Sequence, residues 1–172
     1  MEKLCGYLIN FIFMQQINFS ELGEKEQSLL QEAKGAGARY INKKGTRHIG
    51  AALLCDDGKV YHGVSIRRTN TSNSTCAERM ALDKALFDQN YDYALLAIVG
   101  FFDNNSADGS GKSDQLTPPC GTCRQILSEA QGYGIKNRAI PILLTNSDFS
   151  LVIKTDSQEL LPLAYKADVY KK

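Results

Sequence analysis

The sequence predicts a single α/β domain in which helices cover a five-stranded mixed sheet. Three observations predict this class. Helix and strand patterns follow one another in the order α-β-β-α-β-α-β-β. A hairpin turn signal joins the first two strands, and residues 94–101 form an unbroken apolar run typical of a central strand. The length of 172 residues suits one domain with a buried core.

Strands are predicted where apolar residues alternate or run together between turn signals. The predicted strands span residues 48–55, 59–66, 94–101, 140–145 and 149–154. Asp56-Asp57-Gly58 is the turn between the first two, so we expect this pair to be antiparallel. The later strands are expected to be partly parallel, because helical crossovers join them.

Helices are predicted where apolar residues recur at spacings of three and four. The first extends from Ser20 to about Ile41, although Gly35 and Gly37 weaken it. The second extends from Cys76 to about Gln89, with threonine as its N-cap.

The third predicted helix begins at Thr117, a suitable N-cap, with Pro118 at its first position. It ends near Tyr133-Gly134. The polar, glycine-rich residues 103–117 lead into it as a loop that is placed to act as a lid. A short final helix or turn begins at Ser157.

Three cysteines at the starts of the last two long helices form a pattern typical of a metal site. Cys76 opens the second helix, and Cys120 and Cys123 open the third at Cys-x-x-Cys spacing. Structural zinc sites usually close with four protein ligands, whereas catalytic sites keep three and leave one position for water. No fourth ligand lies nearby on these segments, so we predict an open zinc site. The partial positive charge of both helix N-termini favours deprotonated thiols there.

Glu78 stands two residues after Cys76 and is predicted to move protons rather than to bind the metal. The alternative is a capping-box carboxylate paired with Thr75. Three thiolates around a divalent ion leave a net negative charge. Arg79 and Arg124 are both placed to offset it by hydrogen bonds to sulfur, and we favour Arg79 because it shares a helix turn with the ligand. The alternative for Arg79 is an exposed helix arginine.

On these residues the chain resembles the cytidine deaminase superfamily. The zinc signature of that family is His or Cys, any residue, Glu, and later Pro-Cys-x-x-Cys. Cys76-Ala77-Glu78 and Pro119–Cys123 match it, and Cys at the first position is similar to the branch that contains cytidine deaminase and blasticidin S deaminase. Ile49–Leu54 is similar to the family's Val-Gly-Ala-Ala-Leu strand, and Leu160–Tyr165 is similar to its C-terminal segment.

The resemblance implies a three-layer α-β-α fold and zinc-dependent hydrolytic deamination of cytidine, deoxycytidine or a closely related cytosine nucleoside, with release of ammonia. It implies that Glu78 is catalytic and that the backbone of Ala77 holds the pyrimidine carbonyl. Ser65 and Arg67 would occupy the sugar-reading positions. It also implies a homotetramer in which Tyr165 takes part in a neighbouring subunit's site.

The sugar-reading segment departs from the family pattern. Typical relatives have Gly-x-Asn-x-Glu where this chain has Gly63-Val64-Ser65-Ile66-Arg67, so a carboxylate acceptor is replaced by a cation that only donates. The substrate-stacking Phe is also missing near Arg47-His48.

Other substrates therefore stay open: a cytosine-bearing antibiotic such as blasticidin S, or an anionic cytosine nucleotide bound by Arg67 and Arg68. Solvent-facing arginines are the alternative to such binding. A non-catalytic zinc scaffold is a further alternative, against which the retained Glu78 argues.

Charge and cysteine usage limit the partners. The formal net charge is +1, and no basic run or arginine–aromatic interleaving indicates a polynucleotide surface. We therefore expect a small-molecule substrate and no nucleic acid. The five cysteines form no disulfide framework, which fits a reducing cytoplasm.

Residues 1–19 are set apart from the predicted domain at 20–172. The apolar run within them is too short to span a bilayer, which needs about 20 residues, and it lacks a clear cleavage site, so we expect no membrane partner. One explanation is a translation start placed too early, with Met14 as the natural beginning. The second is a flexible or partner-docking extension.

Overall fold

The computed structural model describes residues 14–39, 47–102 and 116–165 of the chain. Its strands form one sheet in the order β1-β6-β5-β4-β2-β3. The strands are β1 (Gln15–Ile17), β2 (Arg47–Cys55), β3 (Val60–Val64), β4 (Tyr93–Phe102), β5 (Pro141–Asn146) and β6 (Val152–Asp156). The helices are α1 (Glu24–Arg39), α2 (Ala77–Phe87) and α3 (Gly121–Ala130), with short 3-10 turns η1 (Phe19–Glu21) and η2 (Thr71–Asn73). None of the described helices is long and apolar enough to cross a bilayer.

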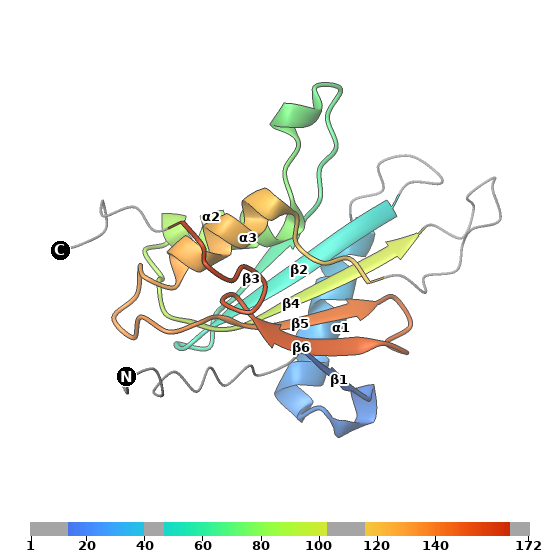
Figure 1. Cartoon of the computed structure of the whole chain (residues 1–172). Coiled ribbons are helices and arrows are strands. Elements are labelled where there is room, and N and C mark those ends of the chain that lie inside the picture. Colours follow the sequence, from blue (N-terminus) through green and yellow to red (C-terminus); the bar gives the residue numbers. More distant parts are fainter. Residues whose placement is uncertain (1–13, 40–46, 103–115, 166–172) are drawn as a thin grey trace, which may run out of the picture.

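Helices cover both faces of this sheet, which confirms the predicted α/β class (Figure 1). β4 pairs with β5 in parallel, and every other pairing in the sheet is antiparallel. Along β2, Ala51 and Leu53 face the core under α2 and α3, whereas Ala52 faces the core under α1. The central strands are therefore buried on both sides, as their continuous apolar sequence predicts.

The prediction of five strands was wrong, because β1 adds a sixth. Gln15–Ile17 pairs antiparallel with Val152–Lys154 at the edge of the sheet. This segment is short and mostly polar, so it carries no strand pattern of its own and depends on its partner for its conformation. It lies within residues 1–19, which were predicted to be separate from the domain at 20–172. Residues 1–13 lie outside the described part of the chain, as do residues 103–115 of the predicted lid at 103–117.

Two glycines allow helices to lie directly on the sheet. A Cβ atom on Gly50 in β2 would lie 1.9 Å from the carbonyl oxygen of Ala33 in α1. A Cβ atom on Gly63 in β3 would lie 2.0 Å from the carbonyl oxygen of Ala77 in α2. Both are far below ordinary van der Waals contact, so only glycine fits at these crossings. The second crossing fixes the first turn of α2 against the sheet.

Both later helices have a cysteine as N-cap, which corrects the predicted starts. α2 begins at Ala77 with Cys76 as N-cap, one residue later than predicted. α3 begins at Gly121 with Cys120 as N-cap, so the predicted N-cap at Thr117 was wrong. Pro118 precedes Pro119, and the residue before a proline is disfavoured in helical conformation. The helix therefore starts only after both prolines.

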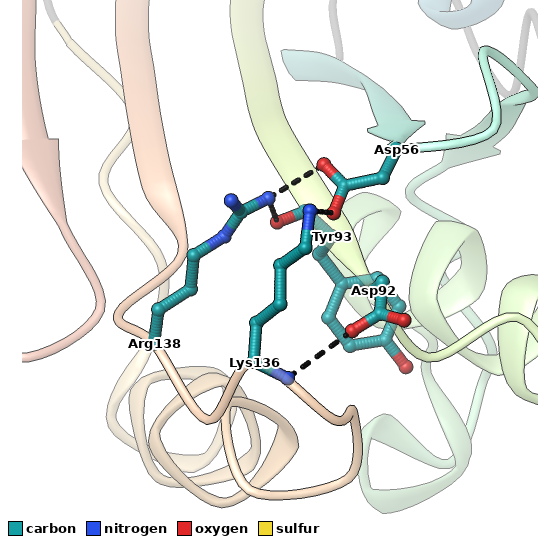
Figure 2. A network of polar contacts seen from close by, with 5 residues as sticks. All are labelled: Asp56, Asp92, Tyr93, Lys136 and Arg138. Carbon is teal, nitrogen blue, oxygen red and sulfur yellow. Dashed lines mark hydrogen bonds and ion pairs between the residues drawn. The ribbon is translucent and has the colours of Figure 1, made fainter.

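A polar network closes the end of the sheet where β2 stops and β4 starts (Figure 2). Asp56 forms ion pairs with Lys136 at 2.5 Å and with Arg138 at 2.6 Å. Arg138 also donates to the carbonyl oxygen of Tyr93 at 3.0 Å, and Asp92 accepts from the backbone of Lys136 at 3.5 Å. The network joins the β2–β3 turn to the α3–β5 connection. α2 and α3 begin near the opposite end of the sheet, after the carboxyl ends of β3 and β4.

Candidate metal and active site

Three cysteine sulfurs meet where the first turns of α2 and α3 face each other. The Sγ atoms of Cys76, Cys120 and Cys123 all lie within 4.8 Å of one another. The Cys76 and Cys120 sulfurs are 3.9 Å apart, and all three cysteines are free thiols. A disulfide would require about 2.05 Å. The three predicted cysteines therefore lie together as separate thiols.

The local backbone explains why these sulfurs converge. Cys76 and Cys120 are the N-caps of their helices, with extended backbone angles, and neither uses its side chain to cap the helix. Cys123 is the third residue of α3, one turn beyond Cys120. An N-cap side chain lies next to the unpaired backbone N–H groups of the first turn. Each sulfur is thus held beside the positive end of a helix dipole, which favours the thiolate form.

The donor set fits zinc. Tetrahedral coordination with zinc–sulfur bonds of about 2.3 Å separates the sulfurs by about 3.8 Å, close to the 3.9 Å between Cys76 and Cys120. Among the described residues, no fourth histidine, cysteine or carboxylate completes the group. Cys123 is buried, Cys76 is half-buried and Cys120 is exposed, so the cluster opens to solvent on one side. These features fit three protein ligands and one accessible position.

A hydrogen bond between Cys76 and Cys123 shifts the pKa values of the two thiols in opposite directions. A hydrogen bond from Cys123 lowers the pKa of Cys76 to about 7, with a smaller contribution from the charge of Arg79. The same hydrogen bond, together with burial, raises the pKa of Cys123. Cys76 is therefore the first of this pair to ionise, and a bound cation would release the proton that Cys123 retains.

Glu78 lies beside the cluster but is not one of its members. Its side chain is only 4 % exposed, and burial raises the pKa of its carboxyl above the ordinary value. The Cys123 thiol donates a hydrogen bond to it. Because α2 begins at Ala77, Glu78 is the second residue of the helix and not the third, so it does not form the capping box with Thr75. A buried carboxylate without a salt bridge in the described structure is a candidate for proton transfer.

The two arginines hold the backbone that carries the ligands. Arg79 donates to the carbonyl oxygen of Ser74 at 3.0 Å, two residues before Cys76. Arg124 donates through Nε to the carbonyl oxygen of Pro119 at 2.9 Å, directly before Cys120. The hydrogen bonds to sulfur that we expected from these arginines stay a prediction. Their positive charges nevertheless lie one residue from Glu78 and from Cys123.

Ser65, Arg67 and Ala77 differ in how close they lie to the cysteines. Ile66 forms an antiparallel bridge with Thr75, and the register of that bridge places Ser65 opposite Cys76. The chain places Ala77 directly after Cys76, at the first position of α2, where its N–H has no intrahelical acceptor.

Arg67 and Arg68 are exposed and directly follow the Ile66–Thr75 bridge. The segment between β3 and α2, which carries η2, projects from the body of the domain (Figure 1). No hydrogen bond or ion pair in the described part of the chain joins Arg67 to the cluster.

Three further features near α2 and α3 were not predicted from the sequence. The Thr117 hydroxyl is buried and has no hydrogen-bond partner in the described structure, three residues before Cys120. Gln125 donates to the carbonyl oxygen of Tyr165 at 2.7 Å. Gln125 stands two residues after Cys123, but its partner lies 40 positions away, so the local pattern could not predict the contact. A groove of about 420 Å³ lies over α2 and β3, lined by residues that include Tyr61 and Phe87 but none of the cysteines.

Comparisons with known proteins agree with this arrangement. A family model described as "Cytidine and deoxycytidylate deaminase zinc-binding region" matches residues 23–137. A cytidine deaminase of Sporosarcina psychrophila is 33 % identical over 142 residues, covering 83 % of this chain and 92 % of the relative. A blasticidin-S deaminase of Bacillus cereus is 25 % identical over 118 residues, covering 69 % and 76 %. The crystal structure of cytidine deaminase from Burkholderia pseudomallei superimposes with a TM-score of 0.66 at 28 % identity, covering 84 % of this chain and all of that chain.

Proposed function

The chain belongs to the cytidine and deoxycytidylate deaminase family, a family of zinc-binding hydrolytic deaminases, and we propose that its substrate is cytidine, deoxycytidine or a closely related cytosine nucleoside. Water would replace the exocyclic amino group, giving the uracil form and ammonia. One observation carries the proposal. Three free cysteine sulfurs lie within 4.8 Å of one another, and a buried glutamate stands two residues after the first of them.

Cys76, Cys120 and Cys123 would hold the zinc ion. When bound there, zinc supplies a water molecule that is acidic enough to act as a nucleophile near neutral pH. The three thiolates donate much negative charge, and the helix N-termini and the guanidinium groups of Arg79 and Arg124 offset part of it. These groups therefore keep the site from becoming too electron-rich for that chemistry.

Glu78 would carry the proton through the reaction. A carboxylate oxygen of Glu78 accepts a proton from the attacking water and delivers it to the ring nitrogen next to the reacting carbon. A second transfer protonates the departing amine, so that the carbon–nitrogen bond breaks and ammonia leaves. Burial raises the pKa of Glu78, which suits a group that must hold a proton and then release it.

Substrate contacts follow from the surroundings of Cys76. The free N–H of Ala77 would donate to the pyrimidine carbonyl oxygen. Ser65, opposite Cys76, would contact the sugar, and Arg67 would stand at the rim. Arg67 is exposed, which leaves room for a substituent that extends out of the site.

A second candidate substrate class has an observation in its favour. Ser65 and Arg67 replace an amide and a carboxylate that read ribose in typical relatives, and a blasticidin-S deaminase is among the proteins similar to this chain. A cation at the rim favours a cytosine compound with an anionic group, because arginine binds phosphate or carboxylate through paired hydrogen bonds. A cytosine-bearing antibiotic is the other member of this class.

The test is ammonia release by the zinc-loaded protein on a panel of cytidine, deoxycytidine, their 5′-monophosphates and blasticidin S. The proposal expects the highest kcat/KM for one of the free nucleosides. A monophosphate or blasticidin S that exceeds both nucleosides by tenfold or more would move the assignment to the second class. Zinc binding without ammonia release from any member would contradict deamination of cytosine compounds.

We also propose a homotetrameric assembly and a cytoplasmic location. Leu163 and Tyr165 expose large apolar side chains close to α3, and Phe87 is 88 % exposed on α2, which supports burial between subunits in a homotetramer. The described cysteines are free thiols, which supports a reducing cytoplasmic location. Light scattering of the purified protein would test the assembly.

A further inference from the structure

The C-terminal strap, defined here as Leu160–Tyr165, is joined to the start of α3 by the two residues that follow the last zinc ligand. Arg124 donates through Nη1 to the carbonyl oxygen of Leu160 at 3.4 Å. Gln125 donates through Nε2 to the carbonyl oxygen of Tyr165 at 2.7 Å. The strap lies beside α3 in Figure 1. Both ends of the strap are therefore held by side chains from the helix turn that bears Cys123.

The same arginine also holds the other ligand turn. Its Nε donates to the carbonyl oxygen of Pro119 at 2.9 Å, so one guanidinium bridges the residue before Cys120 and the first residue of the strap. The rigid, planar fork of arginine makes such a bridge possible, because its donors keep a fixed angle to one another. The Arg124 side chain thus connects the strap directly to the backbone that precedes Cys120.

Between its two ends the strap has little support. Leu160 is buried in the core under α2 and α3, but Pro162 and Leu163 are exposed. Leu163 has φ = 56°, in the left-handed region that leucine rarely adopts. Strained backbone of this kind persists when the surrounding structure fixes both ends of the segment. Without the contacts of Arg124 and Gln125, we expect the strap to leave this conformation.

We propose that Arg124 and Gln125 are positioning residues that make the strap and the zinc-ligand turn one cooperative unit. Zinc at the cysteines then orders the strap, and the docked strap slows the loss of zinc. Linkage requires that zinc favour the docked strap by the same free energy by which the docked strap strengthens zinc binding. The inference rests on zinc binding by the three cysteines, as in the proposed function, and not on which cytosine compound is deaminated.

The experiment compares Arg124→Lys and Gln125→Leu with the wild type and with Gln158→Leu. Arg124→Lys keeps the positive charge near the thiolates, but an ammonium has no planar fork with which to bridge two carbonyls. Gln125→Leu removes the tie to Tyr165 at similar volume without changing charge. Gln158 is the matched control, because it contacts Gln131 at 3.2 Å, away from the ligand turns.

Two quantities are measured on the full chain: the rate at which zinc passes to an excess of a chromogenic chelator, and hydrogen exchange of the strap amides with and without zinc. In the wild type and in Gln158→Leu, zinc should slow exchange of residues 160–165 about tenfold. In Arg124→Lys and in Gln125→Leu this protection should be lost, and zinc should leave about tenfold faster.

The outcomes separate this inference from the proposed function. If Arg124→Lys retains both slow zinc release and zinc-dependent strap protection, the arginine acts through its charge alone and the inference is overturned. The inference is also overturned if the wild type binds zinc and releases ammonia but the strap amides exchange at the same rate with and without zinc. If the wild type takes up no zinc at the three cysteines, the metal site itself is refuted, and the proposed function fails with it.

Discussion

Gly63→Ala tests how the sheet positions the active site. A Cβ atom at Gly63 would lie 2.0 Å from the carbonyl oxygen of Ala77 and 2.7 Å from the nitrogen of Ala81. Both are backbone atoms of α2, so no side chain can turn away to make room. Ordinary contact begins near 3.4 Å, so the first turn of α2 would have to move by about 1.4 Å relative to β3. That turn is bounded by Cys76 and carries Glu78.

The size of the effect follows from this displacement. Forcing a methyl group into a closed contact costs about 1–3 kcal/mol of folding stability. A misplacement of about 1 Å in a catalytic group lowers the rate by about 100-fold. We therefore expect Gly63→Ala to lose about 2 kcal/mol in urea unfolding and to lower kcat/KM for ammonia release by about 100-fold. Zinc should also bind more weakly, because Cys76 moves away from the two cysteines of α3.

Gly121→Ala is the matched control, since it makes the same change between two zinc ligands. A Cβ atom at Gly121 meets nothing within 4 Å in the described structure. The free energy of unfolding should therefore not fall, and the zinc affinity should stay within about twofold of the wild type. Proximity to the metal would predict the opposite order of severity. The reasoning would be refuted if Gly63→Ala retained wild-type unfolding and kcat/KM, because α2 would then not be fixed by this crossing.

Two further predictions concern the rest of the fold. Hydrogen bonds from Lys136 and then Arg138 hold the pKa of Asp56 below its ordinary value. A carboxyl with a lowered folded pKa stabilises the protein above its unfolded pKa of about 3.9, and the contribution is lost as the pH falls through the folded value. Asp56→Asn should therefore cost about 1 kcal/mol in urea unfolding at pH 7. The difference should shrink as the pH falls below about 4 and vanish below the folded pKa of Asp56. An equal difference at neutral and at acidic pH would contradict the ion-pair network. Gly35→Ala places a methyl group in open space within α1 and should raise the unfolding free energy by about 0.5–1 kcal/mol, whereas a loss of stability would show that α1 packs more closely there.

The convergence of the three cysteines was predictable because its signals are local. Cys120 and Cys123 are separated by one helical turn, and a helical apolar pattern follows each cysteine segment. The continuous apolar sequence of β4 likewise predicts burial on both faces, whatever strands lie beside it. Features of this kind depend on residues that are close in sequence, so the sequence alone specifies them.

The remaining features depend on contacts between distant segments. β1 forms because Gln15–Ile17 pairs with β6, which lies more than a hundred residues later in the sequence. The tie between Gln125 and Tyr165 spans 40 residues, and no periodicity marks either partner. The start of α3 was misplaced for a different reason. Pro118 suits a first helical position by itself, but Pro119 after it disfavours that conformation.

The central claim is that a zinc ion at the three cysteines works together with Glu78 to deaminate a cytosine nucleoside. Glu78→Gln tests it most directly, because glutamine matches the shape of the buried side chain but cannot take up the proton. Zinc content and ammonia release would be measured on the same preparations of variant and wild type. We expect about one zinc per chain in both proteins and a fall in kcat of about 1000-fold or more in the variant. Ammonia release by the zinc-loaded variant within about tenfold of the wild type would contradict the account.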